Sequence, residues 1–336
     1  MSMQTQALPR TGMEAGARKA LLLGGGLLLA VLAPFLLYPV FLMKLLCFAL
    51  FACAFNLLIG FAGLLSFGHA AFFGGAAYIA AHTVKEWGWA PEAGLLAATA
   101  VAGLMGLVCG SIAIRRQGIY FAMITLALSQ MIFFLALQLP FTHGEDGIQG
   151  VPRGTLFGLF DLTQPLTMYY VVLAIFLGGF ALVWRTVHSP FGQVLKAIRE
   201  NEPRAVSLGY RTDRYKLVAF VLSASLAGLA GGTKALVFQL ASLTDVTWQM
   251  SGEVVLMTLL GGMGTLLGPV VGAALVVTLE SYLAATSLPV PVVIGCIFVV
   301  CVLLFRRGIV GEILFHISRA TQLRRAARLP PHGRPA

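Results

Sequence analysis

Long apolar runs alternate with short polar segments along almost the whole chain. Runs long enough to cross a bilayer as helices, about 20 residues each, lie near residues 21–40, 45–60, 64–84, 93–114, 119–139, 167–187, 217–238 and 290–305. A further run at 253–280 is interrupted by GGMGTLLGP (residues 261–269), which predicts a hairpin of two short helices. The pattern predicts an all-α integral membrane protein, a polytopic bundle of about ten transmembrane helices with some helices broken at glycines.

The composition favours a single membrane domain. Of the 336 residues, 58% are hydrophobic and 11% are charged, whereas ordinary soluble domains carry about 25% charged residues. The apolar runs leave no polar stretch long enough for a separate soluble core. We therefore expect a short tail at residues 1–19, one membrane domain at 20–306 and a basic tail at 307–336.

The charged residues predict the orientation of the helices. Cytoplasmic loops of membrane proteins carry an excess of Lys and Arg, and such residues gather at Arg18 and Lys19, Arg115 and Arg116, the segment 188–215, and Arg306 and Arg307. The segments at 140–165 and 239–253 are richer in acidic residues and are expected outside. The predicted crossings return the chain to the same side at each basic segment, so both termini are predicted to be cytoplasmic. Topology thus accounts for the net charge of +10 better than nucleic-acid binding does.

Two glycine-rich stretches resemble each other in spacing and predict helix breaks. The first holds Gly60, Gly63 and Gly68; the second holds Gly261, Gly262, Gly264, Gly268 and Pro269. Broken helices often border transport pathways, because irregular backbone at membrane depth must lie against protein or a water-filled cavity. Alternatively, the glycines allow helices to pack closely. The sequence leaves both interpretations open.

The charged segment 188–215 predicts two short helices. Ser189 and Asn201 stand where N-caps are expected, each with a proline in the following turn, and Gly209 suits the end of the second helix. One side of each helix is apolar. Such a pair suits a docking surface in the cytoplasm, and a solvated loop or a membrane-surface helix is the alternative.

Few polar residues lie within the predicted membrane helices. Lys234 is a candidate for the substrate pathway, because a charge at membrane depth usually has a function. It also lies near the outer end of its run, where its side chain could extend to the surface, as could that of Lys44. His69, Asn56 and Gln130 are weaker pathway candidates, since hydrogen bonds between helices would explain them equally well.

The motifs of catalysis and of cofactor binding do not occur. The five cysteines lie in apolar runs without a CxxC pair, so neither disulfides nor a zinc site is indicated. The chain has no G-x-x-x-x-G-K-[ST] motif for binding ATP and no HExxH, and no set of Ser, His and acid residues falls on a plausible common face. We expect no enzymatic activity, no cofactor and no metal, and any ATP hydrolysis must come from a partner.

Several segments resemble one family of membrane proteins. SPFGQVLKAIRENEPRAVSLGYRTDRYKLVAF, starting at Ser189, is similar to the cytoplasmic coupling region of Liv-type branched-chain amino-acid ABC permeases. Within it, Glu202, Ala205 and Gly209 match the EAA loop of importer permeases. NLLIGFAGLLSFGHAAFFGGAAY, GIYFAMITLALSQ, GEDGIQGVP and LLGGMGTLLGPVVGA resemble the LivM-like subunit in the same order, so the resemblance covers roughly residues 56–305.

The resemblance implies a permease subunit of an ATP-driven importer in the bacterial inner membrane, working by alternating access. Its partners would be a LivH-like sister permease, two cytoplasmic ABC ATPases and a periplasmic solute-binding protein. Glu202, Ala205 and Gly209, with Arg199 and Lys196, would contact an ATPase. Lys234 departs from the family, in which we expect a small or aromatic residue there.

The resemblance leaves the solute open. Branched-chain amino acids are the expected substrates, and urea, amides or aromatic acids are alternatives. A self-sufficient secondary transporter or channel, with Lys234 and His69 as coupling groups, is the alternative class. It is disfavoured because an ion-driven carrier usually needs acidic or proton-relaying residues at the midplane.

Overall fold

The structure is a computed structural model that describes residues 25–26, 28–158, 160–284, 290–304, 308–313 and 316. The predicted N-terminal tail, with Arg18 and Lys19, lies outside the described residues, and so do Arg306, Arg307 and most of the C-terminal tail.

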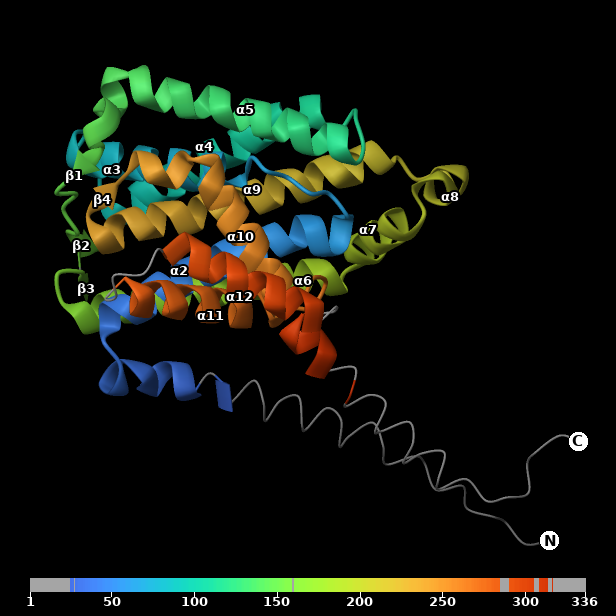
Figure 1. The fold of residues 1–336 in the computed structure, drawn as a ribbon. Helices are drawn as coiled ribbons and strands as arrows, with labels where there is room; N and C mark the ends of the chain where they lie inside the picture. Colours follow the sequence, from blue (N-terminus) through green and yellow to red (C-terminus); the bar gives the residue numbers. More distant parts are fainter. Residues whose placement is uncertain are drawn as a thin grey trace, which may run out of the picture.

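The described chain is a bundle of helices (Figure 1). A helical segment at 28–36 precedes nine bundle helices, which are α2 (Pro39–Asn56), α3 (His69–Lys85), α4 (Pro91–Ala113), α5 (Ile119–Gln138), α6 (Pro165–His188), α9 (Thr212–Phe238), α10 (Trp248–Gly261), α11 (Gly268–Leu283) and α12 (Val290–Leu304). Two short helices, α7 (Pro190–Glu200) and α8 (Glu202–Ser207), lie between α6 and α9. The predicted all-α membrane fold is confirmed.

Five segments of the described chain are long and apolar enough to cross a membrane: Pro39–Ala62, α4, α5, α6 and α9. The first joins α2 to a π-helical turn, η1 (Leu57–Ala62). α10 and α11 are shorter and pack against each other around the turn at 262–267. The predicted hairpin of two short helices is therefore confirmed.

The centre of the bundle is formed by α2 and α9. In the most apolar window of each segment, 89% of residues 39–62 and 67% of α9 are buried, against 28% of α5. Small residues allow the central helices to approach closely. A Cβ on Gly232 of α9, for example, would lie 3.2 Å from a methyl carbon of Leu95 and 3.3 Å from the Cβ of Ala98, both on α4. Close packing thus explains part of the high glycine content.

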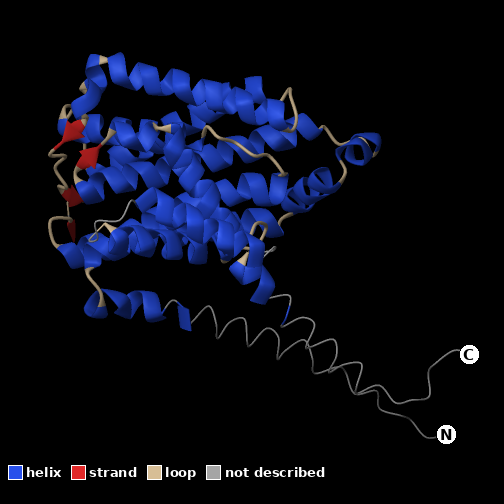
Figure 2. Cartoon of the chain, in the orientation of Figure 1, coloured by secondary structure: helices blue, strands red, loops and turns tan. Residues whose placement is uncertain are grey.

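The short strands gather at one end of the bundle (Figure 2). β1 (Ile148–Gln149) pairs with β4 (Leu240–Ala241), and β2 (Thr155–Leu156) pairs with β3 (Phe160–Asp161). The first pairing joins the two segments that were both predicted to lie outside. α7 and α8 lie at the opposite end, where α4 also connects to α5 (Figure 1). We call these the strand end and the α8 end.

Several predicted boundaries were wrong. The first run, predicted to reach residue 40, ends as a helix at residue 36, and Pro39 opens α2. Apolar residues continue through this turn, so hydropathy alone placed the break too late. α3 begins at His69, after residues 64–68 that were predicted to be helical, and α10 begins at Trp248, five residues before the predicted start.

Candidate functional site

Helices α7 and α8 lie at the α8 end of the bundle. Both begin at the N-caps that the sequence predicted, and the second ends just before Gly209. The hydroxyl of Ser189 accepts a hydrogen bond from the amide of Gly192, 3.3 Å away. The side chain of Asn201 accepts one from the amide of Arg204, 3.1 Å away. Gly209 then takes a left-handed conformation (φ +89°) that an L-residue with a side chain rarely adopts. The prediction of two capped helices is confirmed.

The two helices bury one side and expose the other. Leu195, Ile198 and Ala205 are buried against the bundle, while Val206 and Leu208 are 55% and 69% exposed. One apolar side was predicted for each helix, but in the second helix Ala205 lies against the bundle while Val206 and Leu208 do not. The apolar surface of α8 that points away from the bundle is thus free within the described chain.

A partly buried ion pair anchors α8 to α9. The ammonium of Lys216, whose side chain is 3% exposed, donates to the carboxylate of Glu202. The sequence analysis gave Glu202 a contact with an ATPase, and it did not predict a partner for Lys216. The carboxylate of Glu202 therefore holds α8 in place rather than pointing away from the bundle.

Arg199 and Lys196 line a cleft between α7 and the glycine-rich breaks. The cleft has a volume of about 480 Å³, and its lining is Gly60, Phe61, Lys196, Arg199, Glu200 and Gly264. The guanidinium of Arg199 donates to the carbonyl of Gly60. The ammonium of Lys196 lies 5.8 Å from the centre of the Phe61 ring, within the range of a cation–π contact.

The predicted breaks lie next to each other at this cleft. The chain leaves η1 at Gly63 (φ +74°), and α3 begins after Gly68. In the second stretch α10 ends with Gly261, and Gly262 and Gly264 have positive φ. Gly268 and Pro269 then open α11. Gly60 itself lies inside the π-helical turn, so the helix continues past it.

Asn56 joins the two breaks. It is 1% exposed at the end of α2, and its amide nitrogen donates to the carbonyl of Thr265 at 2.8 Å. Its amide oxygen accepts from the backbone nitrogen of Gly264 at 3.0 Å. The residue predicted as a pathway candidate thus fixes the end of α2 to a backbone segment that lies about 200 positions away in sequence.

His69 lies in an aromatic cage inside the bundle. It is fully buried, and its ring packs edge-on against Phe55, Phe72 and Phe220. Its Nε2 lies 2.7 Å from the hydroxyl of Ser223, whose single proton is donated to the carbonyl of Ala54. Nε2 must therefore carry the imidazole hydrogen. These contacts join α3, α9 and α2, and His69 lines neither the cleft nor the cavity described next.

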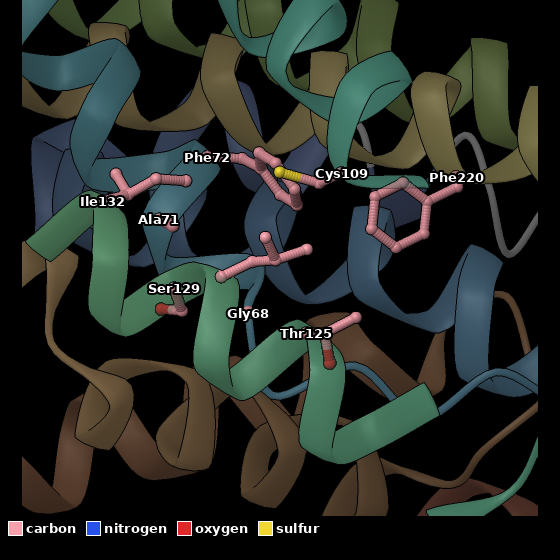
Figure 3. Close-up of a pocket in the computed structure, with 9 residues that line it drawn as sticks. Gly68, Ala71, Phe72, Cys109, Thr125, Ser129, Ile132 and Phe220 are labelled. Carbon is pink, nitrogen blue, oxygen red and sulfur yellow. The ribbon is translucent and has the colours of Figure 1, made fainter. Parts of the chain in front are cut away.

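A small cavity lies between α3, α4, α5 and α9 (Figure 3). Its volume of about 10 Å³ is enough for one water molecule. Thr125 and Ser129 supply its hydroxyls, and the Ser129 hydroxyl has no hydrogen-bond partner among the described residues. Gln130, the next residue on α5, is half-buried and does not line the cavity. The cavity is too small for an amino acid.

Two ion pairs lie away from the α8 end, where the sequence suggested isolated lysines. Lys234 donates to Asp245, which is 1% exposed in the 3₁₀ helix η4 (Leu243–Val246). Lys44 on α2 lies 3.4 Å from Glu280 on α11. Asp245 belongs to the segment 239–253, which was predicted to lie outside, and η4 folds back onto the bundle. Each lysine thus has a carboxylate partner that its position in the sequence did not predict.

No group of three or more His, Cys, Asp or Glu residues within the described ranges is placed to hold a metal ion. Cys47, Cys53 and Cys109 are buried and free.

The chain is similar to known transport proteins. Residues 39–305 match the family model described as "Branched-chain amino acid transport system / permease component". The LivM permease protein of the high-affinity branched-chain amino acid transport system of Escherichia coli K12 is 31% identical over 66% of this chain. Its Salmonella typhimurium counterpart is 30% identical over the same share. Both alignments cover 58% of the relative's own length.

More distant relatives include the autoinducer 2 import system permease protein LsrC of Salmonella typhi. It is 28% identical over 56% of this chain and 56% of its own length. No solved structure matches the chain.

Proposed function

The chain belongs to the family of permease components of branched-chain amino acid transport systems, and we propose that it is the membrane-spanning subunit of an ATP-driven importer of small amino-acid-like solutes. Its helices make it a multi-pass inner-membrane protein. Branched-chain amino acids are the proposed substrates, because the relatives with the highest identity carry that description.

The exposed apolar surface on α8 is the observation that carries the proposal of an ATPase partner. Val206 and Leu208 are exposed at the tip of the α8 end, with Arg204 and Arg211 beside them in sequence. Contiguous apolar patches rimmed by polar residues mark interaction sites, and Val206 on α8 and Leu208 just after it would form the apolar centre of such a patch. The α8 end would face the cytoplasm, because basic residues gather there.

The remaining partners follow from the same proposal. Uptake against a gradient needs an energy source, and the chain lacks an ATP-binding motif of its own. Two cytoplasmic ATPases would supply the energy, and a periplasmic solute-binding protein would deliver the solute. A sister permease would complete the pathway, since the small cavity between α3, α4, α5 and α9 has room for one water molecule and not for an amino acid. Both termini would lie in the cytoplasm, and the two sides of the membrane would be opened in turn.

The experiment is uptake of radiolabelled leucine into proteoliposomes. One set would contain this chain alone, and another the chain with its sister permease, ATPases and solute-binding protein. A third set would carry ATPases whose ATP-binding Lys is replaced. We expect accumulation in the second set alone, and only with ATP inside the vesicles.

Two results would change the assignment. Accumulation by the chain alone would show a self-sufficient secondary transporter and overturn the proposal. ATP-driven uptake of another solute, with leucine excluded, would leave the importer but replace its substrate. The LsrC relatives, named for import of autoinducer 2, favour including such a solute in the assay.

A further inference from the structure

Near the end of the helix formed by α2 and η1, one backbone carbonyl accepts a hydrogen bond from Arg199. The helix ends at Ala62, and the amide of Gly63 bonds back to the carbonyl of Leu58. Carbonyls in the last turn of a helix lack amide partners within the helix. That of Gly60 accepts a hydrogen bond from the guanidinium of Arg199 on α7. Bonds from a charged donor are roughly twice as strong as neutral ones, so α7 is held to the backbone of the first break.

The second break is tied to the same place through Asn56. Its amide bonds the carbonyl of Thr265 and the nitrogen of Gly264, which fixes the turn at 262–267 to the end of α2. Both bonds reach backbone atoms. Asn56 is buried, so these bonds are shielded from competing water.

The glycines bring these segments into direct contact. A Cβ on Gly60 would lie 2.7 Å from the nitrogen of Gly264, closer than a real Cβ approaches. A Cβ on Gly264 would lie 3.2 Å from the Nη1 of Arg199, and φ at Gly264 is +73°. The two breaks and the tip of Arg199 therefore meet without an intervening side chain.

From this arrangement we infer that Arg199 and Asn56 form a linkage that transmits movement of α7 to both glycine-rich breaks at once. Arg199 connects α7 to the first break, and Asn56 connects the first break to the second. The π-helical turn and the left-handed glycines between them are the segments that can change conformation at low cost. The inference rests on the proposed function, because an ATPase acting on α7 and α8 supplies the movement. Arg199 is thus a positioning residue for transport.

A purely structural role for Arg199 gives a different expectation. A bond that only stabilises the fold would, when removed, lower the amount of folded complex. It would not change the number of solute molecules imported per ATP hydrolysed. That ratio is independent of how much complex folds, and it therefore distinguishes transmission from stability.

The test compares three variants in the complete reconstituted importer. Arg199→Met removes the donor, and Arg199→Lys keeps a cation that donates to one acceptor. Gln193→Met changes an exposed polar side chain on the same helix, away from the breaks. For Arg199→Met we expect the ATPases to remain bound and active, while leucine imported per ATP falls at least about fivefold, the low end of typical coupling between sites. Arg199→Lys should lie between Met and wild type, and Gln193→Met should equal wild type.

Each other result has a distinct meaning. An unchanged ratio in Arg199→Met overturns the linkage. Loss of bound ATPase in Arg199→Met also overturns it, since Arg199 would then act in docking. Arg199→Lys is the fallback if Arg199→Met yields no complex, and a wild-type ratio in Arg199→Lys would then count against the linkage. A wild-type complex that imports leucine without ATP refutes the proposed function itself, whatever the variants do.

Discussion

Two adjacent glycines on α3 offer a direct test of how the strand end is packed. A Cβ on Gly74 would lie 2.6 Å from the carbonyl carbon of Asp245 and 2.6 Å from a methyl carbon of Val246, both in η4. Since carbon atoms in contact lie about 3.5–4.0 Å apart, Gly74→Ala requires η4 to move by about 1 Å. A Cβ on Gly75 would meet only the end of the Met105 side chain, at 3.3 Å from its methyl carbon and 3.7 Å from its sulfur, and this flexible end can move aside.

Both substitutions should stabilise the helix equally, but only Gly74→Ala should also create a steric clash. Replacing glycine by alanine inside a helix stabilises it by about 0.8–1.0 kcal/mol, equally at both positions. Overpacking costs about 1–3 kcal/mol and applies to Gly74 alone, because the atoms that it meets belong to backbone and a packed side chain. We therefore expect Gly74→Ala to be less stable than Gly75→Ala by about 1–3 kcal/mol. At roughly 2 °C per kcal/mol for a chain of this size, the difference in Tm is about 2–6 °C.

Thermal unfolding of the two variants, purified in the same detergent, measures this difference. Gly75→Ala should unfold at or slightly above the wild-type temperature, and Gly74→Ala below Gly75→Ala. Equal unfolding temperatures, or a higher one for Gly74→Ala, would refute the close approach of η4 to α3.

Three further predictions concern the ion pairs and the turn after α8. Lys216→Met leaves the partly buried carboxylate of Glu202 without its partner and should cost about 1–3 kcal/mol. In a double-mutant cycle of unfolding free energies, adding Glu202→Gln should recover part of the loss, and additive losses would contradict the pair. Asp245→Asn should lower the Tm, and adding Lys234→Met should restore much of it, whereas an unchanged Tm for the single variant would show that the pair contributes little. Gly209→Ala should lower the Tm, because a left-handed alanine costs about 1–2 kcal/mol, and circular dichroism melts that match wild type would argue against this conformation.

Local signals in the sequence were enough for the features that depend on a few neighbouring residues. Ser189 and Asn201 are caps because a short polar side chain precedes a proline and a helical pattern, and both bonds form within three residues. The hairpin of α10 and α11 followed from the glycines and proline between two apolar runs. The boundary at Pro39 was missed because Leu37 and Tyr38 are as apolar as the helices that they separate.

Contacts between distant segments could not be predicted in the same way. Lys44 and Glu280 are 236 positions apart, and Asn56 and Thr265 are 209 apart. Hydropathy gave no indication of which helices are central. The most apolar windows of residues 39–62 and of α5 have similar mean hydropathies, 2.4 and 2.0. Of these two windows, however, the first is 89% buried and the second 28%. Which polar groups meet depends on how the helices pack, and one sequence does not contain that information in local form.

ATP-driven transport by this chain requires a nucleotide-hydrolysing partner, which we propose binds the exposed side of α8. A photo-crosslinking residue at position 208 would report that partner, and the same residue at position 157, at the strand end, is the control, because Leu208 and Phe157 are both 69% exposed. On illumination of inner membranes that contain the whole importer, position 208 should form a cross-link to an ATPase subunit, and position 157 should not. A cross-link to the ATPase from position 157, with none from position 208, would contradict the account.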